Sequence, residues 1–364
     1  MTQREQQILE WIRQDPMISQ EDLAQRAGIT RSSVGVHISN LMKKGCILGK
    51  GYLLPDSGYV AVAGAVNVDI GGRSAGPLVG RDSNPGTVTV SMGGVGRNIA
   101  HNLRLLGVRV SLLTALGEDP HAGQVADSCE RLGIDLSRAL HVPGGTTSTY
   151  LFLSDETGDM ALAVSDMGIY EALTPAYFAR HLGFLNGAAL VVADANLPQE
   201  ALDYLAHHCT APLLVDPVST VKAEKVRPIL GKLHTLKPNR LEAELLSGVA
   251  IRDLPSARQA AGKLLETGLQ RVFISLGTQG VFAADHTQDV WYPCCPAQMR
   301  SATGAGDAFA AALAWAFLEG KDLADSARAA NAAAAIAVEG EKTINPALSA
   351  EAVQARMTEQ EEAL

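Results

Sequence analysis

A glycine-rich turn near the C-terminal end is the segment of the chain best suited to chemistry. It reads Ser301-Ala302-Thr303-Gly304-Ala305-Gly306-Asp307, and apolar residues at helical spacing follow it to Leu318. A helix that begins here leaves its first N–H groups free to bind phosphate or a developing oxyanion. Its dipole should keep Asp307 ionised and able to accept a proton. The turn is therefore suited to phosphoryl transfer to a hydroxyl group, with a plain loop-to-helix junction as the alternative.

Further polar residues lie where an open α/β sheet binds ligands. Asn67 and Asp69 follow the apolar run 59–65, and a carboxylate at the carboxyl end of a strand accepts hydrogen bonds from two vicinal hydroxyls. Gly93 and Gly94 allow a backbone to approach a sugar ring, with Asn98 in the first turn of the next helix. A turn-forming role for Asn67 and Asp69 is the alternative.

Glu242, three residues after Asn239, is a candidate metal-binding carboxylate. Mg²⁺ keeps most of its waters and takes few protein ligands, so one carboxylate is enough to hold its hydration shell. The alternative is an ordinary solvated glutamate on a helix.

The elements that position these residues begin after residue 58. Apolar, β-branched runs alternate there with helical stretches, which predicts a mostly parallel sheet covered by helices on both faces. The runs are residues 59–65, 108–113, 189–193, 213–215 and 272–276. Polar and apolar residues alternate over 87–91 and 148–153, and a turn at 155–159 leads from the second segment into 160–164, which predicts a hairpin. These half-exposed strands favour a small sheet that serves as a lid or a dimer surface.

The first 55 residues have a different pattern, with apolar residues at helical spacing in three short segments. Ser19 and Thr30 are predicted N-caps, and Gly28 a C-terminal cap. Residues 46–54, with glycines at 49 and 51, predict two short strands around a turn. The segment resembles the winged helix-turn-helix DNA-binding domains of bacterial regulators.

Charge is distributed unevenly between the two parts of the chain. Residues 1–55 contain seven basic and five acidic side chains, a net +2, which leaves −11 of the total −9 for the remainder. We expect the third helix to enter the major groove of double-stranded DNA through Arg31, Ser32, Ser33 and His37, with Lys50 of the wing on a phosphate. A helical appendage used for dimerisation or protein contact is the alternative.

Composition excludes several classes of protein. Of 364 residues, 47% are hydrophobic and 19% charged, so the chain is neither disordered nor collagen-like. No apolar run approaches the ~18 residues of a spanning helix, and the opening residues are too polar for a signal peptide, so we expect a soluble, cytoplasmic protein without a membrane partner. The five cysteines lack C-x-x-C spacing, which argues against zinc and disulfides.

Five segments, in order, resemble the ribokinase-like (PfkB) carbohydrate kinases: residues 64–69, 93–98, 237–242, 275–280 and 301–309. The resemblance implies a ribokinase-like α/β domain over residues 56–364, with a β lid at about 70–92 and 145–165 and a winged domain over 1–55 before it. It also implies ATP as phosphoryl donor, Mg²⁺, a sugar or nucleoside as alcohol acceptor, and a homodimer formed through the lid. Ser301 stands where the family often has an Asp associated with a monovalent cation, which leaves activation by such a cation open.

The resemblance also implies a role for each matched residue. Asp307 is the base, with the anion hole at Gly304, Ala305 and Gly306. The sugar-binding residues are Asn67, Asp69, Gly93, Gly94 and Asn98, and the metal residue is Glu242. Those expected at ATP are Asn239, Ser275, Gly277, Gly280, Thr303, Gly304, Gly306 and Asn331. Thr149 and Asp166, beside the lid, are expected near the substrate.

Within the family, residues 82–86, 93–100, 165–167, 215–219 and 235–244 resemble those of the bacterial pseudouridine kinases. This implies phosphorylation of the ribose 5′-hydroxyl of pseudouridine. Val95 stands where ribose-specific members tend to have Lys, and an apolar residue suits a nucleoside better. The alternatives are another nucleoside or sugar kinase of the family, or a transcription regulator that uses a kinase fold as a ligand sensor.

Overall fold

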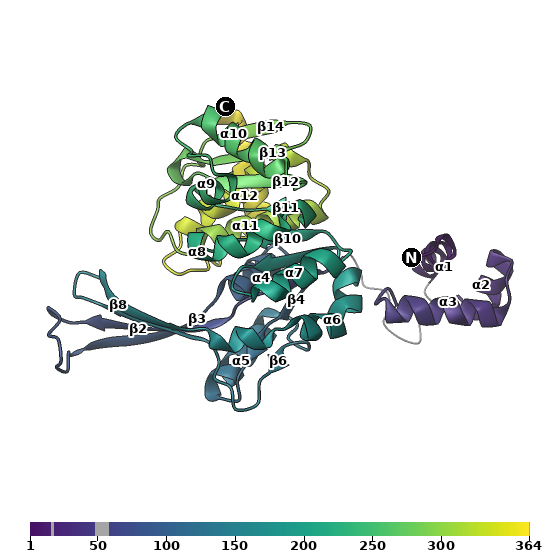
Figure 1. Ribbon diagram of the computed structural model, residues 1–364, viewed down its shortest axis with the longest axis horizontal. Helices are drawn as coiled ribbons and strands as arrows, with labels where there is room; N and C mark the ends of the chain where they lie inside the picture. The colour runs from purple at the N-terminus through teal and green to yellow at the C-terminus, as the bar shows by residue number, and fades with distance from the viewer. Residues whose placement is uncertain (16–17, 48–57, 364) are drawn as a thin grey trace.

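The computed structural model describes residues 1–15, 18–47 and 58–363. Its N-terminal part is a unit of three helices with its own apolar core (Figure 1). The helices are α1 (Gln3–Gln14), α2 (Gln20–Ala27) and α3 (Arg31–Lys43). As predicted, Ser19 and Thr30 cap α2 and α3, and Gly28 ends α2 with a φ of 63°. Most of the wing predicted over residues 46–54 lies outside the described residues.

The C-terminal part is built on an eight-stranded sheet with the strand order β14-β13-β12-β11-β10-β9-β1-β4. The six strands from β12 to β4 are parallel, and β13 and β14 are antiparallel at one edge. The strands are β1 (Val60–Ala63), β4 (Val110–Leu113), β9 (Leu190–Asp194), β10 (Leu213–Asp216), β11 (Thr235–Leu236), β12 (Arg271–Ser275), β13 (Val281–Asp285) and β14 (Asp289–Tyr292). The five apolar runs correspond to five of the six parallel strands, which confirms the predicted sheet.

Helices cover both faces of this sheet, because side chains alternate between two cores along each strand. Val60 and Val62 of β1 belong to one core and Ala61 and Ala63 to the other. The first core is covered by α4 (Val95–Leu105), α5 (Pro120–Leu132), α11 (Ala305–Leu318), α12 (Leu323–Val338) and α13 (Ala350–Ala363). The second is covered by η1 (Gly168–Ala172), α6 (Pro175–Gly187), α7 (Gln199–His208), α8 (Thr220–Ala223), η2 (Glu224–Lys232), α9 (Arg240–Ser247) and α10 (Leu254–Leu265).

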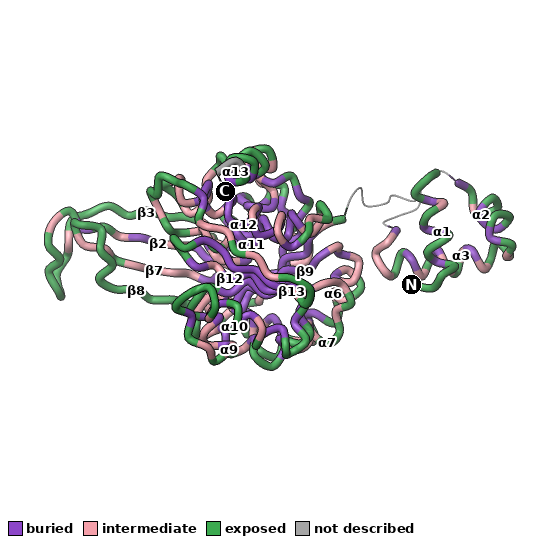
Figure 2. Tube along the Cα trace, turned by 90° about the horizontal axis from the view of Figure 1, so that it is seen from above, coloured by how far each residue is buried: buried purple, intermediate pink, exposed green. Residues whose placement is uncertain are grey.

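A second sheet of four strands projects from the body as the lid (Figure 2). Its order is β3-β2-β7-β8, and β7 and β8 form the predicted hairpin. The strands are β2 (Asn67–Ser74), β3 (Gly86–Gly93), β7 (Thr149–Ser154) and β8 (Met160–Asp166), while β5 (Ala115–Leu116) and β6 (Leu140–His141) pair separately. Among the described residues, no helix has both the length and the apolarity needed to cross a bilayer.

Candidate active site

Charged side chains gather at the carboxyl ends of neighbouring parallel strands. Asp194 ends β9, Asp216 ends β10 and Lys237 follows β11. They are only 1%, 3% and 5% exposed, respectively. Lys237 Nζ donates a hydrogen bond to Asp216 Oδ2 at 2.9 Å. Because open α/β sheets bind ligands at this edge, these buried charges mark the functional end of the sheet.

The electrostatics of these groups follow from their burial and their mutual contact. Burial opposes the charge of Lys237, but the surrounding carboxylates, Asp216 first, outweigh it and raise the pKa of the ammonium group. Burial raises the pKa of Asp194, whose oxygens accept N–H groups of Ala65 at 2.8 Å and Asn196 at 2.9 Å. Lys237 is therefore a fixed positive charge at the sheet edge.

Sequence reasoning gave these three residues no role, although a signal for two of them exists. Asp194 and Asp216 each follow a short, fully buried apolar run, at residues 190–193 and 213–215. A charge at the end of a buried strand needs a partner or a ligand. This pattern would have selected Asp194 and Asp216, whereas Lys237 follows the two-residue segment Thr235–Leu236 and has no such signal.

The glycine-rich turn begins helix α11 at the same edge. Gly304 is the N-cap with a φ of 86°, and a Cβ there would lie 2.0 Å from the backbone oxygen of Thr343, so the turn requires glycine. Lys237 Nζ lies 3.0 Å from where a Cβ on Gly306 would sit. The free N–H groups of the helix and the lysine ammonium group thus adjoin one another, an arrangement that fits a phosphate group.

Asp307 lies in the first turn of α11 and is half-buried. Its Oδ2 accepts a hydrogen bond from Asn98 Nδ2 at 2.8 Å. Burial raises the pKa of Asp307 to about 7, the Asp216 carboxylate acts in the same direction, and the Asn98 hydrogen bond and Lys237 oppose both. The expectation of a fully ionised Asp307 is therefore wrong, because lost hydration outweighs the helix dipole. A carboxyl group with this pKa is well matched to general-base catalysis at neutral pH.

Asn67 and Asp69 lie on the lid side of the candidate site. The prediction that they end the first strand is wrong: β1 ends at Ala63, and both residues belong to the lid strand β2. The Asp194 carboxylate accepts a hydrogen bond from the N–H of Ala65, and the Tyr170 hydroxyl accepts one from the N–H of Val66 at 2.7 Å. These two contacts lead the backbone out of the main sheet before residue 67.

The predicted glycine pair brings α4 against β2. Gly93 pairs with Asn67, and a Cβ on Gly93 would lie 2.0 Å from Asp69 Oδ2. Gly94 has a φ of 92°, and a Cβ there would lie 2.5 Å from Ala65 O. The structure therefore places Asn67, Asp69, Gly93 and Gly94 together, with Asn98 extending from α4 to Asp307.

Thr149 and Asp166 face each other across β7 and β8 at the base of the lid. Thr149 Oγ1 donates to Thr147 O at 3.1 Å, and Asp166 is exposed. Between them and the sugar-binding residues stands Ser148, whose Oγ lies 2.7 Å from Asn67 Oδ1 and 3.0 Å from Asp166 O. Ser148 thus connects the base of the lid hairpin to Asn67.

The residues expected at the nucleotide form a second group along the sheet edge. Asn239 and Glu242 cap α9 reciprocally, so that Glu242 is 2% exposed. Asn239 is bridged to Ser275, which ends β12. The turn η3 (Gly277–Gln279) follows, with Gly277 at a φ of 62° and Gly280 at 91°. A Cβ on Gly280 would lie 2.0 Å from Tyr292 O, so this turn also requires glycine.

The magnesium role that sequence reasoning gave Glu242 stays a prediction, for which its carboxylate group supplies the oxygen ligands that Mg²⁺ prefers. Its two carboxylate oxygens accept hydrogen bonds from the N–H and Nδ2 of Asn239, both at 2.8 Å, and each keeps a further lone pair. No three His, Cys, Asp or Glu side chains of the described residues come together to enclose a metal ion. A single carboxylate that holds water around Mg²⁺ needs no such cluster.

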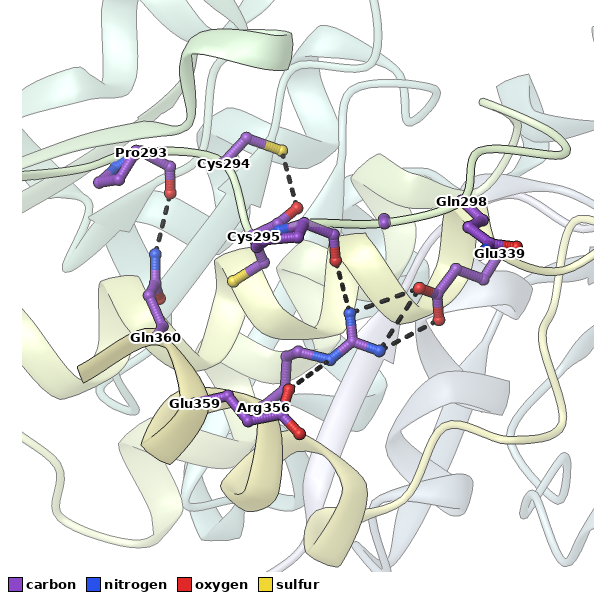
Figure 3. Close-up of a pocket in the computed structure, with 10 residues that line it drawn as sticks. Pro293, Cys294, Cys295, Gln298, Glu339, Arg356, Glu359 and Gln360 are labelled. Atoms are coloured by element: carbon purple, nitrogen blue, oxygen red, sulfur yellow. Dashed lines mark hydrogen bonds and ion pairs between the residues drawn. The ribbon is translucent and has the colours of Figure 1, made fainter. Parts of the chain in front are cut away.

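Thr303 and Asn331, which were also expected at ATP, differ in burial. Thr303 is exposed just before α11, whereas Asn331 is buried on α12 and donates to Pro293 O at 2.6 Å. A cavity of about 560 Å³ lies beside Pro293 (Figure 3). Its charged groups pair with one another, since Arg356 contacts Glu339 at 3.2 Å and Glu359 at 3.5 Å. It is lined by none of the residues expected to react, so it is not the catalytic crevice.

The residues expected at DNA lie on α3 in the N-terminal unit. Arg31 and Ser32 are exposed, and Ser33 and His37 are half-buried. Thr30 Oγ1 lies 3.0 Å from Ser32 Oγ and 2.8 Å from Ser33 Oγ, which orders the start of the helix. Lys50 lies outside the described residues.

Comparisons with known proteins agree with this division of the chain. A pfkB family carbohydrate kinase model matches residues 57–350, and a winged helix-turn-helix DNA-binding model matches residues 1–47. The pseudouridine kinase of Escherichia coli (strain K12) is 41% identical over 80% of this chain and 94% of its own. An uncharacterized sugar kinase of the same organism, YeiI, is 38% identical over 96% of this chain and 98% of its own.

Solved structures show the same architecture. A carbohydrate kinase from Agrobacterium tumefaciens superposes with a TM-score of 0.72 at 28% identity, covering 83% of this chain and 97% of that one. An Arabidopsis thaliana ribokinase complexed with ribose and ATP shares the fold, with a TM-score of 0.75 at 23% identity over 83% and 99%. The chain therefore belongs to the pfkB family of carbohydrate kinases, as a sugar or nucleoside kinase of ribokinase-like fold preceded by a winged helix-turn-helix region.

Proposed function

We propose that the protein is a pseudouridine kinase that transfers the terminal phosphoryl group of ATP to the ribose 5′-hydroxyl. The observation that carries the proposal is the Asn98–Asp307 hydrogen bond of 2.8 Å, which joins the sugar-binding helix to the candidate base. The 41% identity to a pseudouridine kinase supports this substrate over others.

In this mechanism Asp307 accepts the proton of the 5′-hydroxyl as its oxygen attacks phosphorus. The N–H groups of residues 304–307 and the Lys237 ammonium group stabilise the charge on the phosphoryl group in flight. MgATP supplies that group, and Glu242 holds the hydration shell of the metal. Asn67 and Asp69 hold the ribose hydroxyls, and lid closure excludes water from the crevice.

The remaining predicted residues position the two substrates. Gly93, Gly94 and Asn98 contact the ribose, and Thr149 and Asp166 border the uracil ring. ATP lies against the nucleotide group of residues, which comprises Asn239, Ser275, Gly277, Gly280, Thr303 and Asn331. We expect this kinase to work in the cytoplasm, where ATP is available as phosphoryl donor.

An assay of ADP release tests the substrate. With MgATP we expect pseudouridine to give a kcat/KM at least tenfold above uridine, inosine, ribose and fructose. A guanosine-inosine kinase of Exiguobacterium acetylicum, 27% identical, makes inosine the sharpest competitor. A preference for inosine or ribose would assign the chain to another branch of the family, and no ADP release with any acceptor would favour the ligand-sensor alternative.

We also propose that residues 1–55 bind double-stranded DNA through α3. The exposed Arg31 at the start of α3 supports this, because recognition helices contact DNA with their N-terminal residues. In a gel shift with the DNA upstream of the protein's own gene, we expect binding that weakens with salt and with Arg31→Ala. Arg26→Ala is the matched control, because Arg26 is also an exposed arginine but lies on α2. Absence of any shift at low salt would leave this unit as a protein contact.

A homodimer through the lid is the third proposal. One face of the lid carries two rows of side chains in register across all four strands: Val90, Ile70, Leu151 and Val164, then Val88, Gly72, Leu153 and Leu162. Most of these apolar side chains are exposed, and exposed apolar patches of this kind mark interaction surfaces. A second copy of the lid would cover this face with apolar side chains of the same kind.

A further inference from the structure

A buried cation at the start of α4 has no charged partner in direct contact among the residues that the structure describes. Arg97 is 5% exposed; its Nη1 donates to Met92 O at 3.0 Å and its Nη2 to Ser128 Oγ at 2.8 Å. Both acceptors are neutral, and within the described part of the chain Nε has no hydrogen-bond partner. A guanidinium group loses much hydration on burial, so its position requires a compensating negative charge nearby.

The Asp69 carboxylate lies beside the end of strand β3, where Arg97 binds the backbone. Met92, whose carbonyl oxygen accepts from Arg97, is followed by Gly93, and Gly93 lies against the Asp69 carboxylate. Strand β3 is paired with β2 so that Met92 faces Val68 and Ser91 faces Asp69. Arg97 therefore fixes the backbone directly beside the sugar-binding carboxylate.

The two charges also act on each other. Burial raises the pKa of Asp69 above its ordinary value, and the Arg97 charge offsets only part of this rise. Burial lowers the pKa of Arg97, while Cys129 and Asp69 raise it. Asp69 is thus the carboxylate on which the Arg97 charge acts.

The other titratable groups around this pair carry no competing charge close to Asp69. Burial and Arg97 lower the pKa of His101 on α4 to about 4, so its ring is neutral at pH 7. Burial raises the pKa of the Cys129 thiol on α5, which keeps it protonated. Tyr150 faces Asp69 from β7, and Asp307 on α11 is bonded to Asn98.

We propose that Arg97 is a positioning residue for Asp69, which it keeps ionised and correctly placed for the ribose hydroxyls. This inference rests on the proposed function, in which Asp69 binds the acceptor. An ionised carboxylate accepts hydrogen bonds from both hydroxyls of a diol, whereas a protonated one must use one oxygen as a donor. Loss of Arg97 therefore weakens binding of the nucleoside and leaves binding of ATP unchanged.

Three variants separate charge from packing. Arg97→Met removes the charge at similar length, and Arg97→Lys keeps it. Arg104→Met is the matched control, since Arg104 lies on the same helix and also donates to neutral backbone oxygens, of Leu132 at 3.1 Å and Val108 at 2.8 Å. The KM values for pseudouridine and ATP are measured from pH 5.5 to 8.5, together with the melting temperature.

We expect Arg97→Met to raise the pseudouridine KM several-fold at the acid end of this range and to move the acid limb of its pH profile to higher pH, because loss of an opposite charge disfavours the ionised carboxylate. The ATP KM should stay within about twofold. Arg97→Lys should keep the acid limb in place, and Arg104→Met should change neither constant. An equal loss at every pH in both Arg97 variants, with a matching fall in melting temperature, would make Arg97 merely structural and overturn the inference.

A second readout is independent of turnover. The ¹³C resonance of the Asp69 carboxyl group, assigned by comparison with Asp69→Asn, is titrated in the full-length wild-type protein and in Arg97→Met. A midpoint that moves upward in the variant supports the inference, and an unchanged midpoint overturns it. Because this titration needs no substrate, it decides the role of Arg97 even if the protein phosphorylates no nucleoside.

Discussion

The two sides of the candidate site differ in how deeply their residues are buried and in the contacts that keep these residues in place. On the sheet side, Asp194, Asp216 and Lys237 are at most 5% exposed and are fixed by hydrogen bonds and an ion pair. On the lid side, every residue of β8 is exposed and the sheet projects from the body. Elements that must open and close are drawn from the less stable parts of a structure. This difference agrees with the proposal that the phosphoryl transfer takes place on the rigid side and that the lid captures the substrate.

The largest expected effect is on the stability of the sheet side. Lys237→Met leaves Asp216 as an unpaired buried carboxylate, so we expect the free energy of unfolding to fall by about 3–5 kcal/mol in urea titrations. Arg258→Met, which breaks an ion pair with Asp289 whose arginine side chain is 68% exposed, is the control and should cost less than about 1 kcal/mol. An equal loss of unfolding free energy in both variants would contradict the claim that the buried ion pair stabilises the protein more than the exposed one.

The next effect concerns the charge of Asp307. Its folded pKa of about 7 lies above the unfolded 3.8, so its contribution to stability is complete below 3.8 and is lost as pH rises through 7. The Asp307→Asn variant has no carboxyl group that titrates at this position. Its stability relative to wild type should therefore grow between pH 4 and 7 and then level off, reaching a gain of about 1–3 kcal/mol because the half-buried group is partly screened. A difference independent of pH would show that the carboxyl group titrates normally.

The pH dependence of turnover tests the same group on wild-type protein. A base must be deprotonated, so kcat/KM should fall about tenfold per unit below pH 7. Steady-state rates between pH 5.5 and 9 measure this, at a fixed excess of Mg²⁺ over ATP. A limb with its midpoint near pH 4 would indicate that the crevice does not raise the pKa of Asp307.

The smallest effect on stability belongs to the lid. Leu162→Lys combined with Val164→Lys alters side chains that are exposed in the single chain, so the free energy of unfolding of the monomer should change by less than about 0.5 kcal/mol. The same pair should convert the proposed dimer to a monomer in light-scattering measurements. Thr87→Lys, an exposed lid position that alternates with Val88, is the control and should leave the dimer intact.

Local signals in the sequence account for much of the architecture. The cap at Gly28, the turn at Gly304 and the run 190–193 each depend on neighbouring residues alone, and each is where the sequence predicts it. Strand β11 has two residues, too few for a periodic signal, and β2 contains Gly71, Gly72 and Arg73, a composition typical of a loop.

The chemistry of the site depends on contacts that no local pattern contains. Asp307 has a pKa of about 7 because burial and Asp216, 91 positions earlier in the chain, act on it together. The partner of Lys237 is likewise set by the order of strands β10 and β11. Motif spacing selected Asp307 as the candidate base, but its raised pKa could be derived only from the fold.

The central claim is that Asp307 takes the proton of an alcohol while the mouth of α11 holds the phosphoryl group. ³¹P NMR of reactions containing pseudouridine and MgATP tests it most directly, with wild type and Asp307→Asn compared at pH 8. We predict a 5′-phosphomonoester signal with wild type, and with the variant a rate at least about 10³-fold lower although pseudouridine still binds in calorimetry. Similar rates for the two proteins, or no phosphomonoester with wild type, would contradict the account.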